Sequence, residues 1–441
     1  MDSNRTLAVQ ALRAGCLAAL ALVAALAACD EETTVEPPPP PTQIGTVRAY
    51  TKSATGLPNG DVYAFLTLTN GEFWIGTEQG IARYASVNAD QRIAGPDGII
   101  NELNGLPNPK VRDIVLLNGK VYVATWGGGF AIYDVGANTW TSRTPADDTA
   151  DDVFGQAMFL GRTFSNRGSA VIVQPGPNGV LETVPGGDDR VVGQTIVDGP
   201  AVCLNPPEPT CQANGIAETT PHQGLDGSIA DLEPSTTDGK LYIATNHAIS
   251  IYDPVLDRFS SFLTLTREVV STVVVRDTPA GLERWYGPRV ETVEEGTPPP
   301  AGITVWRGTS LVYSYTMVNS GLAEPNVTSI FYDPVGGNDN VWVATANSGV
   351  SLVNVDESTW TTYTALQGLP SNTVYSVTRA NNTIWVATQN GIAYLRGDGT
   401  WQGYNTSGGL AADRVRKIYS DNGTNLWIGY IGEGAALLDT P

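Results

Sequence analysis

The sequence has very little histidine and few positive charges for its 441 residues. Only His222 and His247 are present, which nearly excludes a zinc site built from several imidazoles and catalysis through a His relay. Lys and Arg total 25 against 45 Asp and Glu, so the formal net charge is −20. A chain with this balance lacks the basic surface that binds DNA or RNA, and we expect no nucleic-acid partner.

The apolar run of residues 14–28 is shorter than the roughly 20 residues that a membrane-spanning helix needs. It follows Arg5 and Arg13 and ends in the motif Leu-Ala-Ala-Cys, whose last residue is Cys29. We therefore predict that residues 1–28 are a signal peptide. The motif resembles the bacterial lipobox, in which the cysteine is lipidated and begins the mature protein. An ordinary signal peptide with an incidental Cys29 is the alternative interpretation.

The segment 29–44 contains few residues that could join a hydrophobic core. It is acidic, and five consecutive prolines at positions 37–41 favour an extended chain. We predict a tether that joins a lipidated Cys29 to a folded body. The protein is then expected in the cell envelope, periplasmic or at the cell surface, with acyl chains rather than its acidic surface holding it to the membrane.

Cysteine is scarce in the remainder of the chain, where only Cys203 and Cys211 occur. An even pair in an exported protein predicts a disulfide. A redox-active pair would usually have Cys-x-x-Cys spacing, which these two residues lack.

Glycine and aromatic residues are plentiful, with 48 Gly, 10 Trp and 17 Tyr, which indicates many short strands joined by turns. One phrase recurs along the chain: an aromatic, a β-branched residue, a small residue and Thr. Its aromatics are Trp74, Tyr122, Tyr242, Trp342 and Trp385, with degraded copies at Trp285 and Trp427. We expect these aromatics to lie in the core between blades. A unit of about 43 residues recurs seven times, and such a period built from strands is typical of propeller blades.

Each unit contains strand-like segments separated by hairpin turns. Turns such as Asn70-Gly71, Asn118-Gly119 and Asp238-Gly239 precede the aromatic strand and suit type I′ hairpins. The last unit ends before its fourth strand, and residues 46–51 supply a spare strand at the other end. We therefore predict an all-β, seven-bladed β-propeller of four-stranded blades over residues 45–441. Its ring is closed by the N-terminal strand, and residues 145–223 form one large loop insertion.

The phrases GLPSNTVYSV and NTIWVATQNGIAYL after Gly368, and GLPNGDVYAFLTLTNGEFWIGTEQGIARY after Gly56, resemble the two-component regulator propeller repeat. That family is typically found in bacterial extracytoplasmic sensor regions. The resemblance implies a sensor-like propeller. Full sensors of the family usually carry two propellers and a kinase, whereas this sequence shows one propeller, so we do not expect it to signal by itself.

Alternation of strand direction places the fourth-to-first loops and the second-to-third turns of a propeller on one face. Amides, acids and flat rings in these turns suit a sugar or a peptide, although the amides could instead serve only the turns. The predicted binding residues are Glu78, Gln79, Trp126, Asn246, His247, Arg289, Asn347, Gln389, Asn390 and Tyr430. The expected function is recognition of a glycan or peptide. The alternative is a protein-interaction scaffold of the cell envelope.

Catalysis is the second alternative, as a polysaccharide lyase or a glycosidase. A lyase would need a base such as His247 or a Tyr, and a glycosidase would need two facing carboxylates, which spacing cannot place across a ring. We expect no enzyme activity and no cofactor. Asp188 and Asp189 in the insertion are weak candidates for calcium, but no EF-hand spacing accompanies them.

Overall fold

The computed structural model describes residues 45–144, 171–174, 190–194, 229–245, 249–262, 269–289, 302–308, 310–335, 339–355, 358–420 and 425–439. The predicted signal peptide, the tether and most of the insertion lie outside these residues. Seven predicted site residues also lie outside them: Cys29, Asp188, Asp189, Cys203, Cys211, Asn246 and His247. Of the 145–223 segment, β10 (Val171–Gln174) and β11 (Arg190–Gln194) are described and pair antiparallel.

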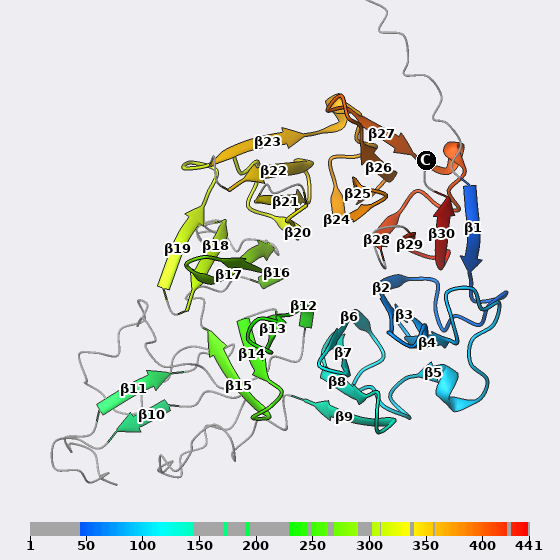
Figure 1. Ribbon diagram of the computed structural model, residues 1–441, viewed down its shortest axis with the longest axis horizontal. Coiled ribbons are helices and arrows are strands. Elements are labelled where there is room, and N and C mark those ends of the chain that lie inside the picture. Colours follow the sequence, from blue (N-terminus) through cyan, green and yellow to red (C-terminus); the bar gives the residue numbers. More distant parts are fainter. Residues whose placement is uncertain are drawn as a thin grey trace, which may run out of the picture. The chain divides into compact units, whose positions relative to one another are not determined.

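Seven four-stranded antiparallel sheets form a ring, and each sheet is one blade, so the predicted fold is confirmed (Figure 1). Blade one contains β2 (Val62–Thr67), β3 (Phe73–Thr77), β4 (Gly80–Tyr84) and β5 (Ile99–Ile100). Blade two contains β6 (Val111–Leu117), β7 (Lys120–Thr125), β8 (Gly129–Asp134) and β9 (Thr139–Arg143). Blade three contains β12 (Ile229–Pro234), β13 (Leu241–Thr245), β14 (Ile249–Asp253) and β15 (Arg258–Phe262).

The other four blades follow in chain order. Blade four contains β16 (Val269–Thr278), β17 (Gly281–Arg289), β18 (Ile303–Arg307) and β19 (Ser310–Tyr315). Blade five contains β20 (Val327–Asp333), β21 (Asn340–Thr345), β22 (Val350–Asn354) and β23 (Thr359–Tyr363). Blade six contains β24 (Val374–Ala380), β25 (Thr383–Thr388), β26 (Gly391–Leu395) and β27 (Trp401–Tyr404). Blade seven contains β28 (Val415–Tyr419), β29 (Leu426–Tyr430), β30 (Ala435–Asp439) and β1 (Gly45–Tyr50).

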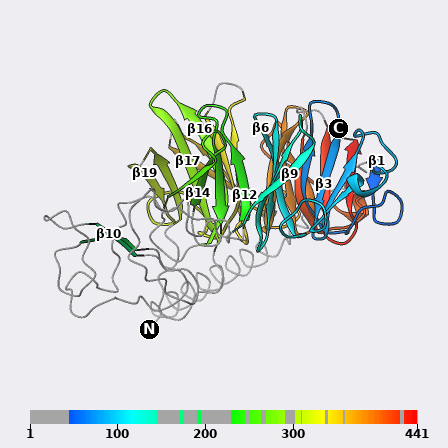
Figure 2. The same cartoon turned by 90° about the horizontal axis from the view of Figure 1, so that it is seen from below.

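The first strand of each blade lies nearest the axis, and the strands run between the two faces of the ring (Figures 1 and 2). Within the described part of the chain, the helical elements are three short 3-10 turns: η1 (Pro96–Gly98), η2 (Ala365–Gln367) and η3 (Thr406–Gly408). Among those same residues, none of the helices is long and apolar enough to cross a bilayer.

The ring is closed by pairing the two ends of the propeller. β1 pairs antiparallel with β30, with Gly45 opposite Asp439 and Tyr50 opposite Ala435. The Tyr50 ring is fully buried, and its centroid lies 4.7 Å from that of Tyr84 and 5.7 Å from that of Trp427. The N-terminal strand therefore supplies both backbone pairing and core packing to blade seven, as the sequence predicts.

The repeated phrase packs the blades against one another. Its aromatics are buried as predicted, and its small residue meets the inner strand of the next blade. A Cβ at Gly76 would lie 2.6 Å from Val111, and one at Gly429 would lie 2.8 Å from Val62. Because those distances are shorter than any ordinary contact, Gly76 and Gly429 leave no room for a side chain, whereas Ala124, Ala244, Ala344 and Ala387 are buried at the same position in other copies.

Every inner strand also has a β-bulge at the equivalent position. There one residue of the inner strand has no partner on the second strand of the blade. We call this residue the bulge residue and the next one the post-bulge residue. The post-bulge residues are Ala64, Asp113, Asp231, Thr272, Ser329, Ser376 and Lys417.

Several of the post-bulge side chains accept a hydrogen bond from the backbone of the next blade. Leu232 N donates to Asp113 at 3.2 Å, and Val273 N donates to Asp231 at 3.0 Å.

The same link recurs in two other blades, because Ile330 N donates to Thr272 Oγ1 at 3.3 Å and Ile418 N to Ser376 Oγ at 3.4 Å. Some backbone N–H groups on the inner edge of one blade therefore find hydrogen-bond acceptors in the side chains of the preceding blade.

The hairpin turns fall into two types. Asn118 and Gly119 both have positive φ, at 51° and 77°, as a type I′ turn requires. At Asn70-Gly71 only the glycine has positive φ, and the same holds at Asp238-Gly239. The expected type I′ geometry is therefore wrong for those two turns, whose longer loops place a single residue in the left-handed region.

We predict that closure by β1 controls the stability of the whole ring. Deleting residues 30–54 should lower the melting temperature strongly, whereas deleting 30–43 should not. Within β1, Tyr50→Ala should destabilise by about 3–5 kcal/mol because it empties a buried aromatic site. Val47→Ala is the matched control, because Val47 is 61% exposed. Thermal and urea unfolding measure both effects, and equal melting temperatures for the two deletions would contradict the closure.

Candidate functional site

Backbone hydrogen bonds tie the second-to-third turns to the fourth-to-first loops on one face, which we call the top face. Glu78 N donates to Asp61 O at 3.2 Å, and Trp126 N donates to Lys110 O at 2.9 Å. Blades five, six and seven repeat the bond through Ala346, Gln389 and Ile431. The loops that carry the predicted site residues are therefore held in fixed positions on a rigid ring.

In blades one, two, five and six, the threonine of the repeated phrase holds the second-to-third turn closed. Thr77 Oγ1 donates to Gly80 O at 2.8 Å, and Thr388 Oγ1 donates to Gly391 O at 2.8 Å. Thr125 and Thr345 make the equivalent bond. Each turn therefore presents its next two residues, such as Glu78 and Gln79, at the top face.

The bulge residues surround the axis at the top ends of the inner strands, and they divide into two halves. On blades three, four and five they are small: Ala230, Ser271 and Thr328. On blades six, seven, one and two they are large: Tyr375, Arg416, Tyr63 and Arg112. The axial mouth is therefore asymmetric, with one half lined by small residues and the other built from alternating rings and guanidinium groups.

The large half forms a continuous row of cation–π contacts. The Arg112 guanidinium carbon lies 4.3 Å from the centroid of Tyr63 and 5.6 Å from that of Trp126. The Arg416 guanidinium carbon lies 4.7 Å from the Tyr375 centroid and 6.0 Å from that of Tyr63. We call these five residues the Arg–Tyr wall. Burial raises the pKa of the Tyr63 phenol although the charge of Arg112 opposes it, so this ring stays neutral at physiological pH.

Glu78 completes the wall at blade one. Arg112 Nη1 donates to Glu78 Oε2 at 2.7 Å, and Lys110 Nζ lies 3.9 Å from Glu78 Oε1. The Glu78 side chain keeps a quarter of its surface exposed. One carboxylate therefore already binds to this cationic surface while remaining open to solvent.

The predicted site residues have different outcomes. Glu78 and Trp126 lie together beside Arg112. Gln79 is exposed next to Glu78 on the same turn, and Asn347, Gln389 and Asn390 are exposed on other top-face turns. Asn347 is tied to the adjacent fourth-to-first loop, because its backbone N–H donates to Glu324 Oε1 at 2.7 Å. Arg289 ends β17, and its side chain is outside the described part of the structure.

Tyr430 was expected to be an exposed platform, and this expectation is wrong. Its side chain is 1% exposed, and its hydroxyl oxygen accepts a hydrogen bond from Ala411 N at 3.2 Å. Tyr430 occupies the position of the phrase threonine in blade seven, where the side chain faces into the blade.

Sequence reasoning missed Tyr63, Arg112, Tyr375 and Arg416. Each follows the valine that begins an inner strand, so aligning the seven units on that valine would have shown large residues in four adjacent blades.

Below the wall, four ionisable side chains line the channel along the axis. Lys417 of blade seven reaches past the small Ala64 of blade one, and its Nζ lies 3.7 Å from Asp113 Oδ1 of blade two. Burial alone would lower the pKa of Lys417, but the carboxylates of Asp113 and Asp231 outweigh that effect and raise it. Burial raises the pKa of Asp231 to about 7 and that of Glu233 to about 8. Lys417 keeps 31% of its side chain accessible although the ring encloses it, because it faces the channel.

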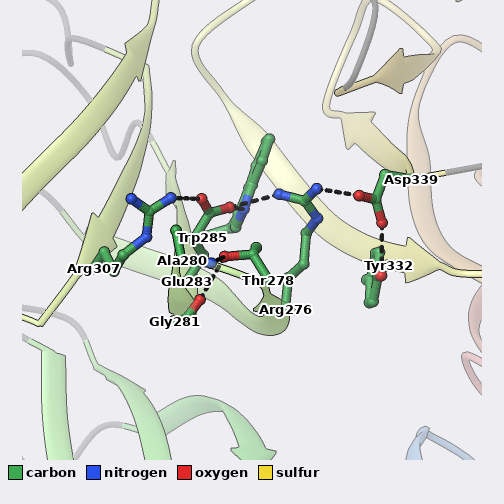
Figure 3. Close-up of polar contacts among 9 residues, drawn as sticks. All are labelled: Arg276, Thr278, Ala280, Gly281, Glu283, Trp285, Arg307, Tyr332 and Asp339. Atoms are coloured by element: carbon green, nitrogen blue, oxygen red, sulfur yellow. Dashed lines mark hydrogen bonds and ion pairs between the residues drawn. The ribbon is translucent and has the colours of Figure 1, made fainter.

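A second charged cluster lies at the opposite face, on the β16–β17 hairpin (Figure 3). Glu283 is 2% exposed and pairs with Arg276 Nη1 at 2.7 Å and with Arg307 Nη2 at 2.6 Å. Arg276 also pairs with Asp339 of blade five, which lowers the pKa of that carboxyl. The charges of the two guanidinium groups and the two carboxylates in this cluster balance one another. It joins blades four and five and leaves no net charge for a ligand.

Among the described residues, no group of three or more His, Cys, Asp or Glu side chains is arranged to hold a metal ion.

No protein-family model and no curated protein matches the sequence. Among solved structures, the chain is similar to an extracellular domain assigned to the hybrid two-component system BT3049 of B. thetaiotaomicron. The TM-score is 0.55 at 15% identity, and the match covers 91% of this chain and 42% of that one. At this identity the likeness shows the propeller fold. The chain spans less than half the length of that structure.

We predict that the channel carboxylates make stability fall as the pH rises. In the folded protein the pKa values of Asp231 and Glu233 are about 7 and 8, against usual values of 3.8 and 4.5. The folded state therefore binds more protons between about pH 4 and pH 8, and its stability declines across that range. The double variant Asp231→Asn/Glu233→Gln should lose roughly 5–10 °C less in melting temperature than the native protein between pH 5 and pH 9, because the two pKa shifts correspond to several kcal/mol across that range.

Glu102→Gln is the control for that experiment, because it removes one exposed carboxylate on a loop. Parallel pH profiles for the native protein and the double variant would contradict the assignment.

Proposed function

We propose that this protein is a membrane-anchored extracytoplasmic propeller that binds a glycan or peptide at the axial mouth of its top face, in the manner of a sensor domain. The observation that carries the proposal is the Arg–Tyr wall. Four bulge residues on adjacent blades, with Trp126, place aromatic faces and cationic edges around one half of an otherwise small-residue mouth. Convergent polar groups beside flat rings are typical of ligand sites.

Two further observations support a binding role. The wall is not needed to close the ring, because β1–β30 pairing and the post-bulge hydrogen bonds do that. The similar solved structure is an extracellular domain assigned to a two-component system, which agrees with the sensor-like interpretation of the repeat. The lipid anchor at Cys29 rests on the sequence motif alone.

A protein-interaction scaffold is the second candidate, and the outer edge of blade four favours it. The edge strand β19 exposes Leu311 and Tyr313 at 50% and 47%, and Val318 beside it is 96% exposed. A groove of about 580 Å³ lies between this edge and Trp360 of blade five. An exposed apolar edge strand is a template for pairing with another chain. Catalysis has no comparable observation in its favour.

We predict that Trp126→Ala and Gln389→Ala weaken ligand binding while leaving the melting temperature nearly unchanged. Both side chains lie in top-face turns, where substitutions usually change stability by less than about 0.5 kcal/mol. A glycan and peptide array probed with the intact propeller identifies the ligand class, and calorimetry with the best hit measures each variant. Leu311→Asp is the matched control, because it alters blade four alone. Loss of binding in Leu311→Asp but not in Trp126→Ala would favour the scaffold.

We also predict that Cys29→Ser abolishes acylation and releases the protein from the membrane. Only the lipidated sulfur would hold the acidic body at the bilayer. Metabolic labelling with palmitate and fractionation of membranes measure the two effects, with Cys16→Ser as the control. Unchanged labelling in Cys29→Ser would overturn the anchor.

A further inference from the structure

Four cations gather at the axial mouth of a protein whose net charge is −20, with Glu78 and Asp113 as their carboxylate partners. Arg112 and Arg416 belong to the wall, and Lys110 lies at its edge. Lys417 follows Arg416 and lies just inside the channel. Low-dielectric walls strengthen the attraction between a charged group and its counter-charge, so these cations favour an anionic ligand at the mouth.

The guanidinium groups of the wall combine a ring contact with donors that suit an anion. The guanidinium carbons of Arg112 and Arg416 lie 4.3 and 4.7 Å from tyrosine centroids, and the edge of a guanidinium group is a planar fork of N–H donors. A carboxylate is the planar group that matches this edge with two parallel hydrogen bonds. Glu78 demonstrates the fit from within the protein, because its two oxygens lie 2.7 and 3.5 Å from Arg112 Nη1 and Nη2.

The two guanidinium groups of the wall lie at a limited separation. The two guanidinium carbons lie 4.3 and 6.0 Å from the same Tyr63 centroid, so they are at most about 10 Å apart. On the far side of the mouth, Ala230, Ser271 and Thr328 project little bulk, and Ser271 and Thr328 donate to backbone carbonyls rather than toward the axis. A ligand with more than one carboxylate can therefore reach both arginines.

The rings distinguish a saccharide from an acidic peptide. Aspartate and glutamate side chains would use only the arginines. A uronate unit carries a carboxylate and an apolar C–H face on one ring, so it uses the arginine edges and an aromatic face such as that of Trp126 together.

We infer that the ligand at the Arg–Tyr wall is an acidic glycan that contains uronate units. The inference rests on the proposed function and specifies its ligand class. The interaction is charge-assisted at both arginines, and Glu78 competes with the ligand for Arg112.

The test measures binding of an oligogalacturonide to the intact propeller by calorimetry. The matched probes are the same oligomer with its carboxyl groups reduced to alcohols, and an oligoglutamate peptide. Arg112→Gln and Arg416→Gln should each weaken oligogalacturonide binding by about tenfold or more, because each removes a charge-assisted hydrogen bond. Glu78→Gln should strengthen it, because the competing carboxylate is gone.

Arg396→Gln is the matched control, since Arg396 is exposed on the β26–β27 hairpin at the opposite face, and it should bind like the native protein. Melting curves verify that each variant is folded. The inference predicts that the reduced oligomer binds at least about tenfold more weakly than the acidic one and that raised salt weakens only the acidic oligomer.

Equal binding of the acidic and reduced oligomers, with both weakened by Trp126→Ala, would overturn the inference and leave the proposed function standing. Tighter binding of oligoglutamate than of oligogalacturonide would overturn it in favour of an acidic peptide. If Trp126→Ala, Arg112→Gln and Arg416→Gln change the binding of no glycan or peptide, the proposed function fails as well.

Discussion

The structure depends on how seven inner strands, each with an open edge toward the axis, are joined to one another. A bulge at the same place in every inner strand turns the post-bulge side chain toward the next blade. There Asp113, Asp231, Thr272 and Ser376 accept hydrogen bonds from neighbouring backbone N–H groups. Those donors would otherwise face a narrow channel with few partners, and an unsatisfied buried donor is costly.

The same bulge creates the site. Skipping one residue in the ladder leaves seven side chains at the top of the axis. There Ser271 and Thr328 hydrogen-bond to the next blade, and the four large side chains contact one another. Their identity is therefore not restricted by the core, unlike that of the phrase aromatics, which must fill space between sheets. Four adjacent blades use this freedom for Tyr375, Arg416, Tyr63 and Arg112, and three use it for small residues. A rigid ring with one asymmetric end is suited to binding without a large change of shape.

Charged side chains have different surroundings in three parts of this acidic protein: the opposite face, the channel and the top mouth. At the opposite face, the pairs of Arg276 and Arg307 with Glu283 and Asp339 are matched and mostly buried, and they join blades. In the channel, Lys417 offsets Asp113 across the small Ala64, while Asp231 and Glu233 hold protons more tightly than usual. At the top mouth, Arg112 and Arg416 lie over tyrosine rings and are partly exposed to solvent.

The sequence by itself determined the fold, the number of blades and the closing strand. The phrase repeats at intervals of about 43 residues, which is the length of one blade. Close packing requires its small residue, and the turn requires its threonine. The spare strand at the N-terminal end completes the last blade. The sequence did not determine the site. Glu78 and Trp126 could be named because they follow the phrase threonine, but Tyr430 takes that threonine's own place and turns inward. Arg112 and Tyr63 are 49 positions apart, and only closure of the ring and the bulge geometry bring guanidinium and ring within 4.3 Å. Side chains from different blades meet through the ring, and no local pattern encodes which neighbours face the axis together.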